Sequence, residues 1–207
     1  MTEKRIIVFT RYQEPGRTKT RLIPVLGAQG AAMLQRQMTE HTLNTVASFI
    51  KDYPVTVEIC YDGGSLNQMT SWLGQGRLYT VQGKGDIGMR MARAFDLAFR
   101  TGVKQAVLTG TDCPGICPAI LKTAFTSLNV NDLVLGPARD GGYYLIGLKT
   151  IVWEIFDGIN WGTDSVLTQT LDVVKQLGLK YSLLEMLNDI DRCEDLPVWE
   201  KIKHGDP

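Results

Sequence analysis

The chain has 207 residues, of which 44% are hydrophobic and 21% charged, a composition that suits one globular domain with a core of ordinary size. Lys plus Arg and Asp plus Glu number 22 each, so the formal net charge is zero. This balance argues against a protein that coats nucleic acid, although a local basic patch can still bind a phosphorylated small molecule. Because no apolar run approaches membrane-spanning length, we expect no membrane insertion.

The four cysteines indicate free thiols. Only Cys113 and Cys117 are close in sequence, at a spacing that is uncommon in zinc and redox motifs, and the chain has only two histidines. Free thiols suit a reducing compartment, and the first residues show no signal-peptide core. We therefore expect a cytoplasmic protein.

Apolar runs of strand length alternate with helical patterns along the chain. The predicted strands span residues 5–10, 55–61, 77–81, 104–109, 132–135, 143–148 and 181–186. Helices are expected from Ala28 to before Pro54, over 65–73, from Asp86, over 119–128, from Thr163 or Asp164 to Leu177, and over 196–203. Such alternation predicts an α/β fold over residues 1–207: a single domain whose mostly parallel central sheet is covered by helices on both faces.

A basic loop follows the first predicted strand. It carries Arg11, Gly16, Arg17, Lys19 and Arg21. Backbone amides freed by glycine, together with Lys and Arg, form a natural cradle for a polyphosphate. The loop lacks the Gly-Lys-Ser/Thr ending of a Walker motif, and the alternative is a solvated basic loop.

A glycine-rich stretch, Gln82 to Met91, follows the third predicted strand. Gly83, Gly85 and Gly88 would let a ligand approach the backbone closely. The spacing does not meet the dinucleotide-binding fingerprint. Asp86 could equally be the N-cap of the next helix.

Asp112 is the first candidate for chemistry. It lies in Gly110-Thr111-Asp112-Cys113-Pro114-Gly115, directly after the apolar run 104–109. A carboxylate at the carboxyl end of a buried strand lies where open α/β sheets bind their ligands. The alternative is that Asp112 closes a turn or caps the helix after Pro118.

Two further acidic stretches follow later strands. In Asp140-Gly141-Gly142-Tyr143-Tyr144 the two tyrosines should point to opposite faces of the sheet. In Asn188-Asp189-Ile190-Asp191 the aspartates alternate, so only one is expected to face a shared site. Mg²⁺ usually takes one or two carboxylates and completes its shell with phosphates and water, so Asp112 and Asp191 could supply that pair. Whether Asp189 or Asp191 is the second ligand stays open, and both could instead cap the final helix.

No pairing of serine or cysteine with histidine suggests a nucleophile and its base. His41 lies within a predicted helix that offers it no partner. The chemistry should therefore depend on positioning and charge neutralisation.

Taken in order, the motifs resemble a known family over roughly residues 5 to 200. The motifs are Pro15-Gly16 with Lys19-Thr20-Arg21-Leu22 and Pro24, Gly85-Asp86-Ile87-Gly88 with Arg90-Met91, Gly110-Thr111-Asp112-Cys113-Pro114, Asp140 to Gly147, Trp161-Gly162-Thr163, and Asp189-Ile190-Asp191 with Glu194-Asp195-Leu196. The set resembles the DUF2064 family, which is grouped with glycosyltransferases of the nucleotide-diphospho-sugar transferase superfamily. More distantly it is similar to phospholactate guanylyltransferase and to the molybdopterin-cofactor nucleotidyltransferases.

The resemblance implies a Rossmann-like GT-A fold that binds a nucleotide, Mg²⁺ or Mn²⁺, and a small-molecule acceptor. It implies metal ligation by Asp112 and Asp191, and catalytic roles for Asp112, Lys19, Arg21 and Asp140. The implied nucleotide-binding residues are Arg11, Gly16, Lys19, Arg21, Gly85, Asp86, Gly88 and Thr111. The implied acceptor-binding residues are Gly141, Gly142, Tyr143 and Trp161.

Two departures from the family pattern affect the predicted reaction. Arg192-Cys193 replaces Thr-Pro after Asp191, and Asp112 is followed by Cys113-Pro114 where many glycosyltransferases have an Asp-X-Asp pair. The second departure, together with the Lys/Arg loop, favours nucleotidyl transfer from a nucleoside triphosphate to a small phosphorylated or hydroxyl acceptor, whereas the usual label of the family favours sugar transfer. The alternatives are a glycosyltransferase with a nucleotide-sugar donor and a non-catalytic nucleotide-binding module. The four tryptophans leave open whether the chain forms a homodimer.

Overall fold

The alternating strands and helices form one seven-stranded sheet in the computed structural model, which describes residues 3–204. The strands are β1 (Lys4–Arg11), β2 (Thr56–Asp62), β3 (Leu78–Val81), β4 (Gln105–Thr109), β5 (Leu133–Pro137), β6 (Tyr143–Leu148) and β7 (Tyr181–Leu183). The α-helices are α1 (Ile23–Phe49), α2 (Leu66–Leu73), α3 (Ile87–Arg100), α4 (Pro118–Ser127), α5 (Val166–Gln176) and α6 (Leu196–His204). Short 3₁₀ helices are η1 (Thr20–Leu22), η2 (Trp153–Phe156) and η3 (Cys193–Asp195).

The strand order is β3-β2-β1-β4-β6-β5-β7. β6 runs antiparallel to β4 and β5, and the other pairs are parallel. The connection from β5 to β6 spans only residues 138–142, which is too short for the crossover that a parallel neighbour would need. The predicted α/β fold with a mostly parallel sheet is thereby confirmed.

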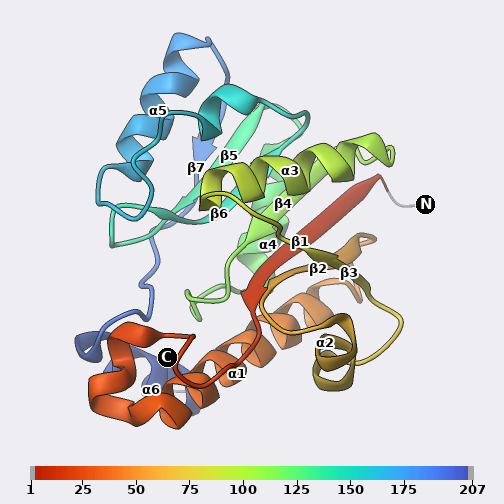
Figure 1. The fold of residues 1–207 in the computed structure, drawn as a ribbon. Helices are drawn as coiled ribbons and strands as arrows, with labels where there is room; N and C mark the ends of the chain where they lie inside the picture. Colours follow the sequence, from red (N-terminus) through yellow and green to blue (C-terminus); the bar gives the residue numbers. More distant parts are fainter. Residues whose placement is uncertain (1–2, 205–207) are drawn as a thin grey trace.

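Helices cover both faces of the sheet, as predicted (Figure 1). On one face, α1, α2 and α4 pack on the sheet through an apolar cluster that includes Phe49, Met69 and Phe125. On the other face, α3, α5 and η2 pack through a cluster that includes Phe95 and Val174. The interior of β1 is buried on both faces, which explains why its sequence is an unbroken apolar run.

Gly27 explains the predicted start of the first helix at Ala28. Its φ of +69° interrupts the helical backbone, so that a short turn from Ile23 precedes the long helical run. The last strand is shorter than predicted and ends at Leu183. Beyond it the chain stays beside the sheet: the amide of Leu184 donates to the carbonyl of Leu135 at 2.8 Å, and Leu187 forms an isolated bridge with Ala138.

The C-terminal helix α6 packs against α1 (Figure 1). Its Trp199 lies edge-on to the ring of His41 of α1, with the ring centroids 5.8 Å apart. His41, for which the sequence offered no partner, donates from Nε2 to the carbonyl of Pro114 at 2.9 Å. The helix pair therefore supports the loop that carries Asp112. Within residues 3–204, no helix combines the length and apolar character needed to cross a bilayer.

Candidate active site

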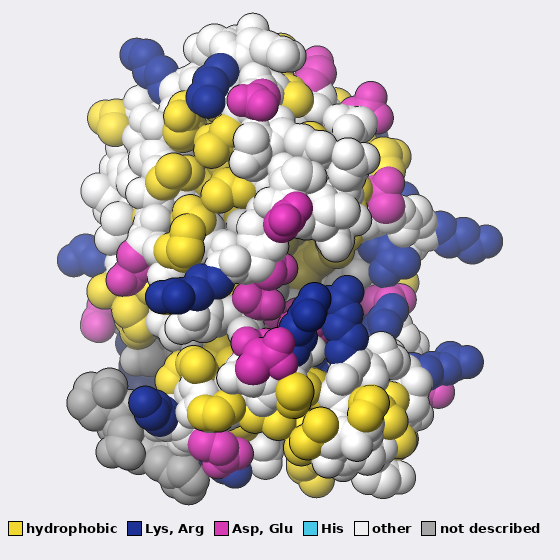
Figure 2. All heavy atoms as spheres, turned by 90° about the vertical axis from the view of Figure 1, so that its left-hand side faces the viewer, with side chains coloured by type: hydrophobic (Ala, Val, Ile, Leu, Met, Phe, Trp, Pro, Cys, Tyr) yellow, Lys and Arg dark blue, Asp and Glu magenta, His cyan; other side chains and the backbone are white. Residues whose placement is uncertain are grey.

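Three adjoining cavities lie along the carboxyl edge of the parallel strands. The first, of about 350 Å³, is lined from β1, β2, β4, β6 and α3, and the second, of about 280 Å³, shares Asp112, Tyr143 and Tyr144 with it. The third, of about 420 Å³, shares Asp140, Asp189 and Asp191 with the second. Acidic and basic side chains gather around a hollow on one face of the molecule (Figure 2). These cavities lie at the edge of the sheet where the sequence predicted a ligand site.

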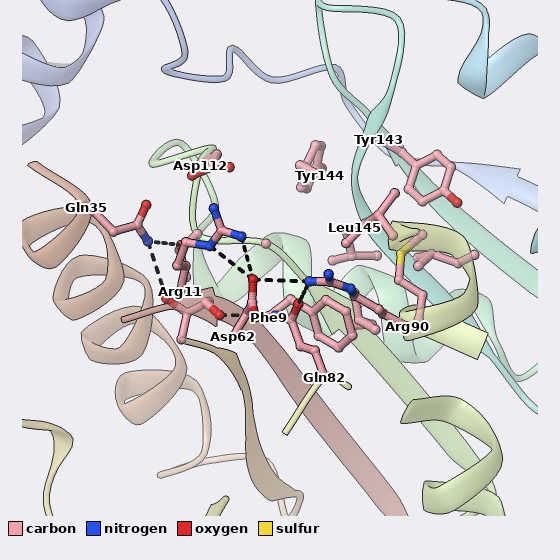
Figure 3. A pocket seen from close by; sticks show the side chains of 17 residues that line it. Phe9, Arg11, Gln35, Asp62, Gln82, Arg90, Asp112, Tyr143, Tyr144 and Leu145 are labelled. Carbon is pink, nitrogen blue, oxygen red and sulfur yellow. Dashed lines mark hydrogen bonds and ion pairs between the residues drawn. The ribbon is translucent and has the colours of Figure 1, made fainter. Parts of the chain in front are cut away.

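Two arginines share one carboxylate in the first cavity (Figure 3). Arg11 Nη2 lies 2.5 Å and Arg90 Nη1 lies 3.2 Å from Asp62 Oδ2. Partial burial of Asp62 favours its neutral form, but the hydrogen bonds and charges of the two arginines prevail and lower the pKa of Asp62. The network joins the ends of β1 and β2 to the first turns of α3.

Two buried glutamines frame the same cavity (Figure 3). Gln82 donates from Nε2 to the carbonyls of Thr10 and Cys60, both at 3.1 Å. Gln35 of α1 donates to Thr39 Oγ1 at 3.2 Å and lies 3.4 Å from Thr111 Oγ1. Because their amide groups are held by the protein, these side chains form a preorganised polar wall above an apolar floor that includes Phe9.

Lys19 connects three segments that are distant in the sequence. Its Nζ lies 2.8 Å from Asp112 Oδ1 and donates to the carbonyl of Ile190 at 2.6 Å. The Lys19 side chain is only 4% exposed, whereas that of Asp112 is 55% exposed. Lys19 has a φ of +47°, the only positive φ of a non-glycine residue in the part of the chain described. Left-handed backbone at such a residue costs about 1–2 kcal/mol, and it directs the ammonium group inward.

Arg21 binds the second aspartate that the sequence predicted as a metal ligand. Its guanidinium forms an ion pair with Asp191, at the boundary between the second and third cavities. The backbone amide of Asp191 donates to Asp195 Oδ2 at 3.0 Å, and Ile190 before it is completely buried. Asp191 therefore has a fixed position, set by its own segment.

Four carboxylates line the second cavity: Asp112, Asp140, Asp189 and Asp191. Burial, followed by the negative charge of Asp140, raises the pKa of Asp189. Carboxylate oxygens are the donors that Mg²⁺ and Mn²⁺ prefer. Within residues 3–204, however, no three acidic, histidine or cysteine side chains come close enough to hold a metal ion by themselves. The donor set fits an ion whose shell is completed by a ligand and water, and the structure brings Asp112 and Asp191 to the same cavity.

The residues predicted to face the acceptor lie around the second cavity. Gly142, Tyr143 and Trp161 line it, with the rings of Tyr143 and Trp161 edge-on at 6.2 Å. Gly141 does not line it; a Cβ there would lie 2.2 Å from the carbonyl oxygen of Asp164. The Tyr143 hydroxyl is buried, and burial raises the pKa of Tyr143, so only its ring is offered to a ligand. Tyr144 belongs to the opposite core cluster, as the alternation along β6 predicted.

Five residues predicted to bind the nucleotide lie outside the lining of the three cavities: Gly16, Lys19, Gly85, Asp86 and Gly88. Gly16 is exposed in the basic loop, and the carbonyl of Gly85 accepts a hydrogen bond from Arg90 Nε at 2.9 Å. Asp86 caps α3 by accepting from the amide of Met89 at 2.8 Å, the alternative role considered from the sequence. Gly88 packs against Trp161, where a Cβ would lie 2.4 Å from the indole ring. Their contact with a nucleotide stays a prediction, while Arg11 and Thr111 do line the first cavity.

Sequence reasoning missed Asp62, Gln35 and the site role of Arg90. Asp62 directly follows a predicted strand, much as Asp112 follows another, and that position was the available signal. Gln35 gave no local signal, because its contact with Thr111 joins residues 76 positions apart.

Comparisons with known proteins agree with the fold. The family model described as "Uncharacterized protein conserved in bacteria (DUF2064)" matches residues 45–163. A crystal structure from Desulfovibrio desulfuricans G20, provisionally classed as a nucleotide-diphospho-sugar transferase, is 35% identical, with a TM-score of 0.89 over 96% of this chain and 87% of that chain. No protein with a curated description matches the chain significantly.

Two more distant structures share the fold alone. CMP:2-keto-3-deoxy-manno-octonic acid synthetase, solved with CTP, is 10% identical, with a TM-score of 0.59 over the whole of both chains. Glucosyl-3-phosphoglycerate synthase from Mycobacterium tuberculosis, solved with Mn²⁺, UDP and glucosyl-3-phosphoglycerate, is 11% identical, with a TM-score of 0.56 over 98% of this chain and 76% of that chain. The 35% identical relative, provisionally classed as a nucleotide-diphospho-sugar transferase, agrees with the predicted enzyme class, the transferases. The chain belongs to the DUF2064 family, and its fold is that of the nucleotide-diphospho-sugar transferases.

Proposed function

We propose that this protein is a divalent-metal-dependent transferase that moves a nucleotidyl group from a nucleoside triphosphate to a small phosphorylated or hydroxyl acceptor. The observation that carries the proposal is the convergence of Asp112 and Asp191 on one cavity, each beside a cation of the loop after β1. Carboxylates alternating with cations match the charge pattern of a metal–polyphosphate complex. Fold relatives solved with CTP, and with UDP and Mn²⁺, support the same class of ligand.

The first cavity would receive the nucleoside. Its apolar floor offers a surface for a ring, and the held amide and guanidinium groups of Gln82, Arg11 and Arg90 offer edges for hydrogen bonds. From there the polyphosphate would extend past Asp112 into the second cavity, which the first adjoins.

Each charged side chain would then have a defined task. Asp112 and Asp191 would hold Mg²⁺ or Mn²⁺, which when bound neutralises phosphate charge and orients the α-phosphate. Lys19 would hold the Asp112 carboxylate in place, and Arg21 would meet phosphate oxygens. Asp140, whose Oδ1 already accepts from the amide of Gly142 at 2.8 Å, would orient an acceptor in the second cavity. The acceptor oxygen would bond to the donor's α-phosphorus as the bond from that phosphorus to the bridging β-phosphate oxygen breaks, and pyrophosphate would leave. A hydroxyl acceptor would give its proton to a carboxylate of the second cavity.

A glycosyltransferase is the second candidate. The 35% identical relative is provisionally classed as a nucleotide-diphospho-sugar transferase, and Asp140 and Asp189 line the cavity where a sugar acceptor would bind. The same pocket would then hold a nucleotide-sugar, and a carboxylate would accept the proton of the acceptor hydroxyl.

Product analysis separates these candidates. The protein is screened with nucleoside triphosphates and nucleotide sugars for thermal stabilisation that requires Mg²⁺ or Mn²⁺. The stabilising donor is then incubated with a pool of sugar phosphates, phosphoglycerates and sugars. Release of pyrophosphate supports nucleotidyl transfer, and release of a nucleoside diphosphate from a nucleotide sugar supports glycosyl transfer. Metal-dependent binding without turnover of any donor would favour a non-catalytic module.

A further inference from the structure

The two predicted metal ligands are paired with cations of very different character. Lys19, which binds Asp112, is 4% exposed and makes a second bond to the carbonyl of Ile190. Arg21, which binds Asp191, is 61% exposed, and within residues 3–204 its guanidinium binds no other side chain. One cation is built into the protein interior, and the other lies over the site from outside.

We infer that Arg21 is an exchangeable counter-ion that covers Asp191 in the unliganded protein and moves to the phosphates when a metal–polyphosphate complex arrives. This inference rests on the proposed function and adds a coupling between its two ligands. The metal takes the carboxylate that Arg21 releases, and the released guanidinium takes a phosphate oxygen. Charge is balanced before and after the exchange.

Arg21 rather than Asp191 moves, because the two side chains are held differently. Asp191 follows the completely buried Ile190, and its amide and that of Arg192 both bind the carboxylate of Asp195. Arg21 is a long side chain with most of its surface in solvent, and an exposed ion pair of this kind contributes only about 0.2–1 kcal/mol. Breaking the pair is therefore cheap, and a phosphate offers Arg a stronger, bidentate partner.

The exchange makes metal and polyphosphate binding mutually dependent. Metal alone competes with Arg21 for Asp191, and polyphosphate alone competes with Asp191 for Arg21. Whichever ligand binds first therefore separates Arg21 from Asp191 and frees the side chain that the second ligand binds. By thermodynamic linkage, the factor by which one ligand strengthens the other must be the same in both directions.

Arg21→Gln tests the inference with probes that do not depend on the unknown base. Binding of Mn²⁺ alone, of pyrophosphate in EDTA and of preformed Mn²⁺–pyrophosphate is measured by calorimetry, with protein-bound Mn²⁺ checked by its paramagnetic resonance signal. Arg139→Gln is the matched control, because Arg139 also lines the third cavity but has no ion pair with Asp191 in the described chain.

The expected result has opposite signs for the two probes. In Arg21→Gln, Mn²⁺ alone should bind about two- to fivefold more tightly, which corresponds to the loss of one exposed ion pair. Mn²⁺–pyrophosphate should bind about tenfold more weakly, because a charge-assisted hydrogen bond to phosphate is lost. In Arg139→Gln the dissociation constants for Mn²⁺ and for Mn²⁺–pyrophosphate should both stay within about twofold of the parent values at 0.15 M salt, where exposed charges are screened.

Two outcomes would overturn the inference while leaving the proposed function intact. In the first, the wild-type protein binds Mn²⁺–pyrophosphate, but the Arg21→Gln variant binds Mn²⁺ alone no more tightly than the wild type does. The other is an equal effect of Arg139→Gln, which would assign the change to the general field of the cavity. Wild-type protein that binds neither probe would instead count against the proposed function and the inference together.

Discussion

Lys19 Nζ lies 2.8 Å from Asp112 Oδ1 and 2.6 Å from the carbonyl oxygen of Ile190. The backbone amide of Ile190 in turn donates to the carbonyl oxygen of Asp112 at 2.9 Å. These bonds close a ring between the loop after β1, the loop after β4 and the segment before α6. The residues that would hold the ligand are therefore fixed to one another before any ligand binds, and such preorganisation lowers the cost of binding.

We predict a large coupling energy between Lys19 and Asp112. Lys19→Met, Asp112→Asn and the double variant are compared with the parent by urea unfolding. Because the ammonium group is buried, we expect a coupling of about 1–2 kcal/mol. The control cycle is Arg36–Glu40, an ion pair of the same 2.8 Å length on the exposed face of α1, for which about 0.3–0.5 kcal/mol is expected. A coupling no larger than that of the control would show that Lys19 does not fix Asp112.

Ile190 is predicted to anchor both neighbouring aspartates. It is completely buried in a cluster with Leu22 and Trp199, so Ile190→Ala should lower the free energy of unfolding by about 2–4 kcal/mol. It should also weaken Mn²⁺ binding, since Asp189 and Asp191 depend on this anchor. Ile155→Ala, at an equally buried site in another cluster, should cost similar stability without changing Mn²⁺ affinity. Equal Mn²⁺ affinity in both variants would contradict the anchoring role; Ile190→Val serves if the alanine variant does not fold.

Asp62 should stabilise the protein in a pH-dependent way. Arg11 and Arg90 lower its pKa in the folded state, so its stabilising contribution is complete above the unfolded value, about 3.9, and is lost as the pH falls through the folded value. At pH 7 and at pH 5, Asp62→Asn should therefore lower the free energy of unfolding by about 1 kcal/mol, a value that allows for solvent screening of the partly exposed pair. The difference from the parent should shrink below about pH 4. Urea unfolding from pH 7 to pH 3.5 checks this; a difference that grows on acidification would refute the pairing.

The stability effect of a side chain at Gly88 is predicted to arise from Trp161 alone. A Cβ at Gly88 would lie 2.4 Å from the indole, so Gly88→Ala should destabilise the protein by about 1–3 kcal/mol and change tryptophan fluorescence. In a Trp161→Ala background, Gly88→Ala should instead stabilise the protein, because Ala is favoured over Gly inside a helix by about 0.8–1 kcal/mol. A cost that persists without Trp161 would point to another contact.

The sequence predicted the features that depend on local chemistry. Apolar runs marked the strands, the helical pattern marked the start of the long helix at Ala28, and Asp86 was recognised as a candidate N-cap. The position of Asp112 after a buried strand predicted that it lies at the carboxyl edge of the sheet, where it lines the second cavity. Such signals depend on propensity and on the twofold and 3.6-fold periods, both of which can be counted in the chain.

The contacts that organise the site could not be predicted in the same way. Asp62 meets Arg11 and Arg90 only because β1, β2 and α3 end at one place, and each residue alone resembles an ordinary surface charge. Lys19 was expected to meet phosphate, yet its left-handed backbone and buried ammonium group direct it to Asp112 and Ile190. These are consequences of tertiary geometry, which no local pattern encodes.

The most direct test of the account is calorimetric titration with nucleoside triphosphates and nucleotide sugars, with Mg²⁺ or with EDTA, in the parent and in Asp112→Asn. The asparagine keeps an acceptor for Lys19, so circular dichroism should show that the fold is retained. The account predicts that at least one nucleotide binds the parent only with metal, and that Asp112→Asn loses this binding. Binding that ignores the metal, or that is equally tight in Asp112→Asn, would contradict it.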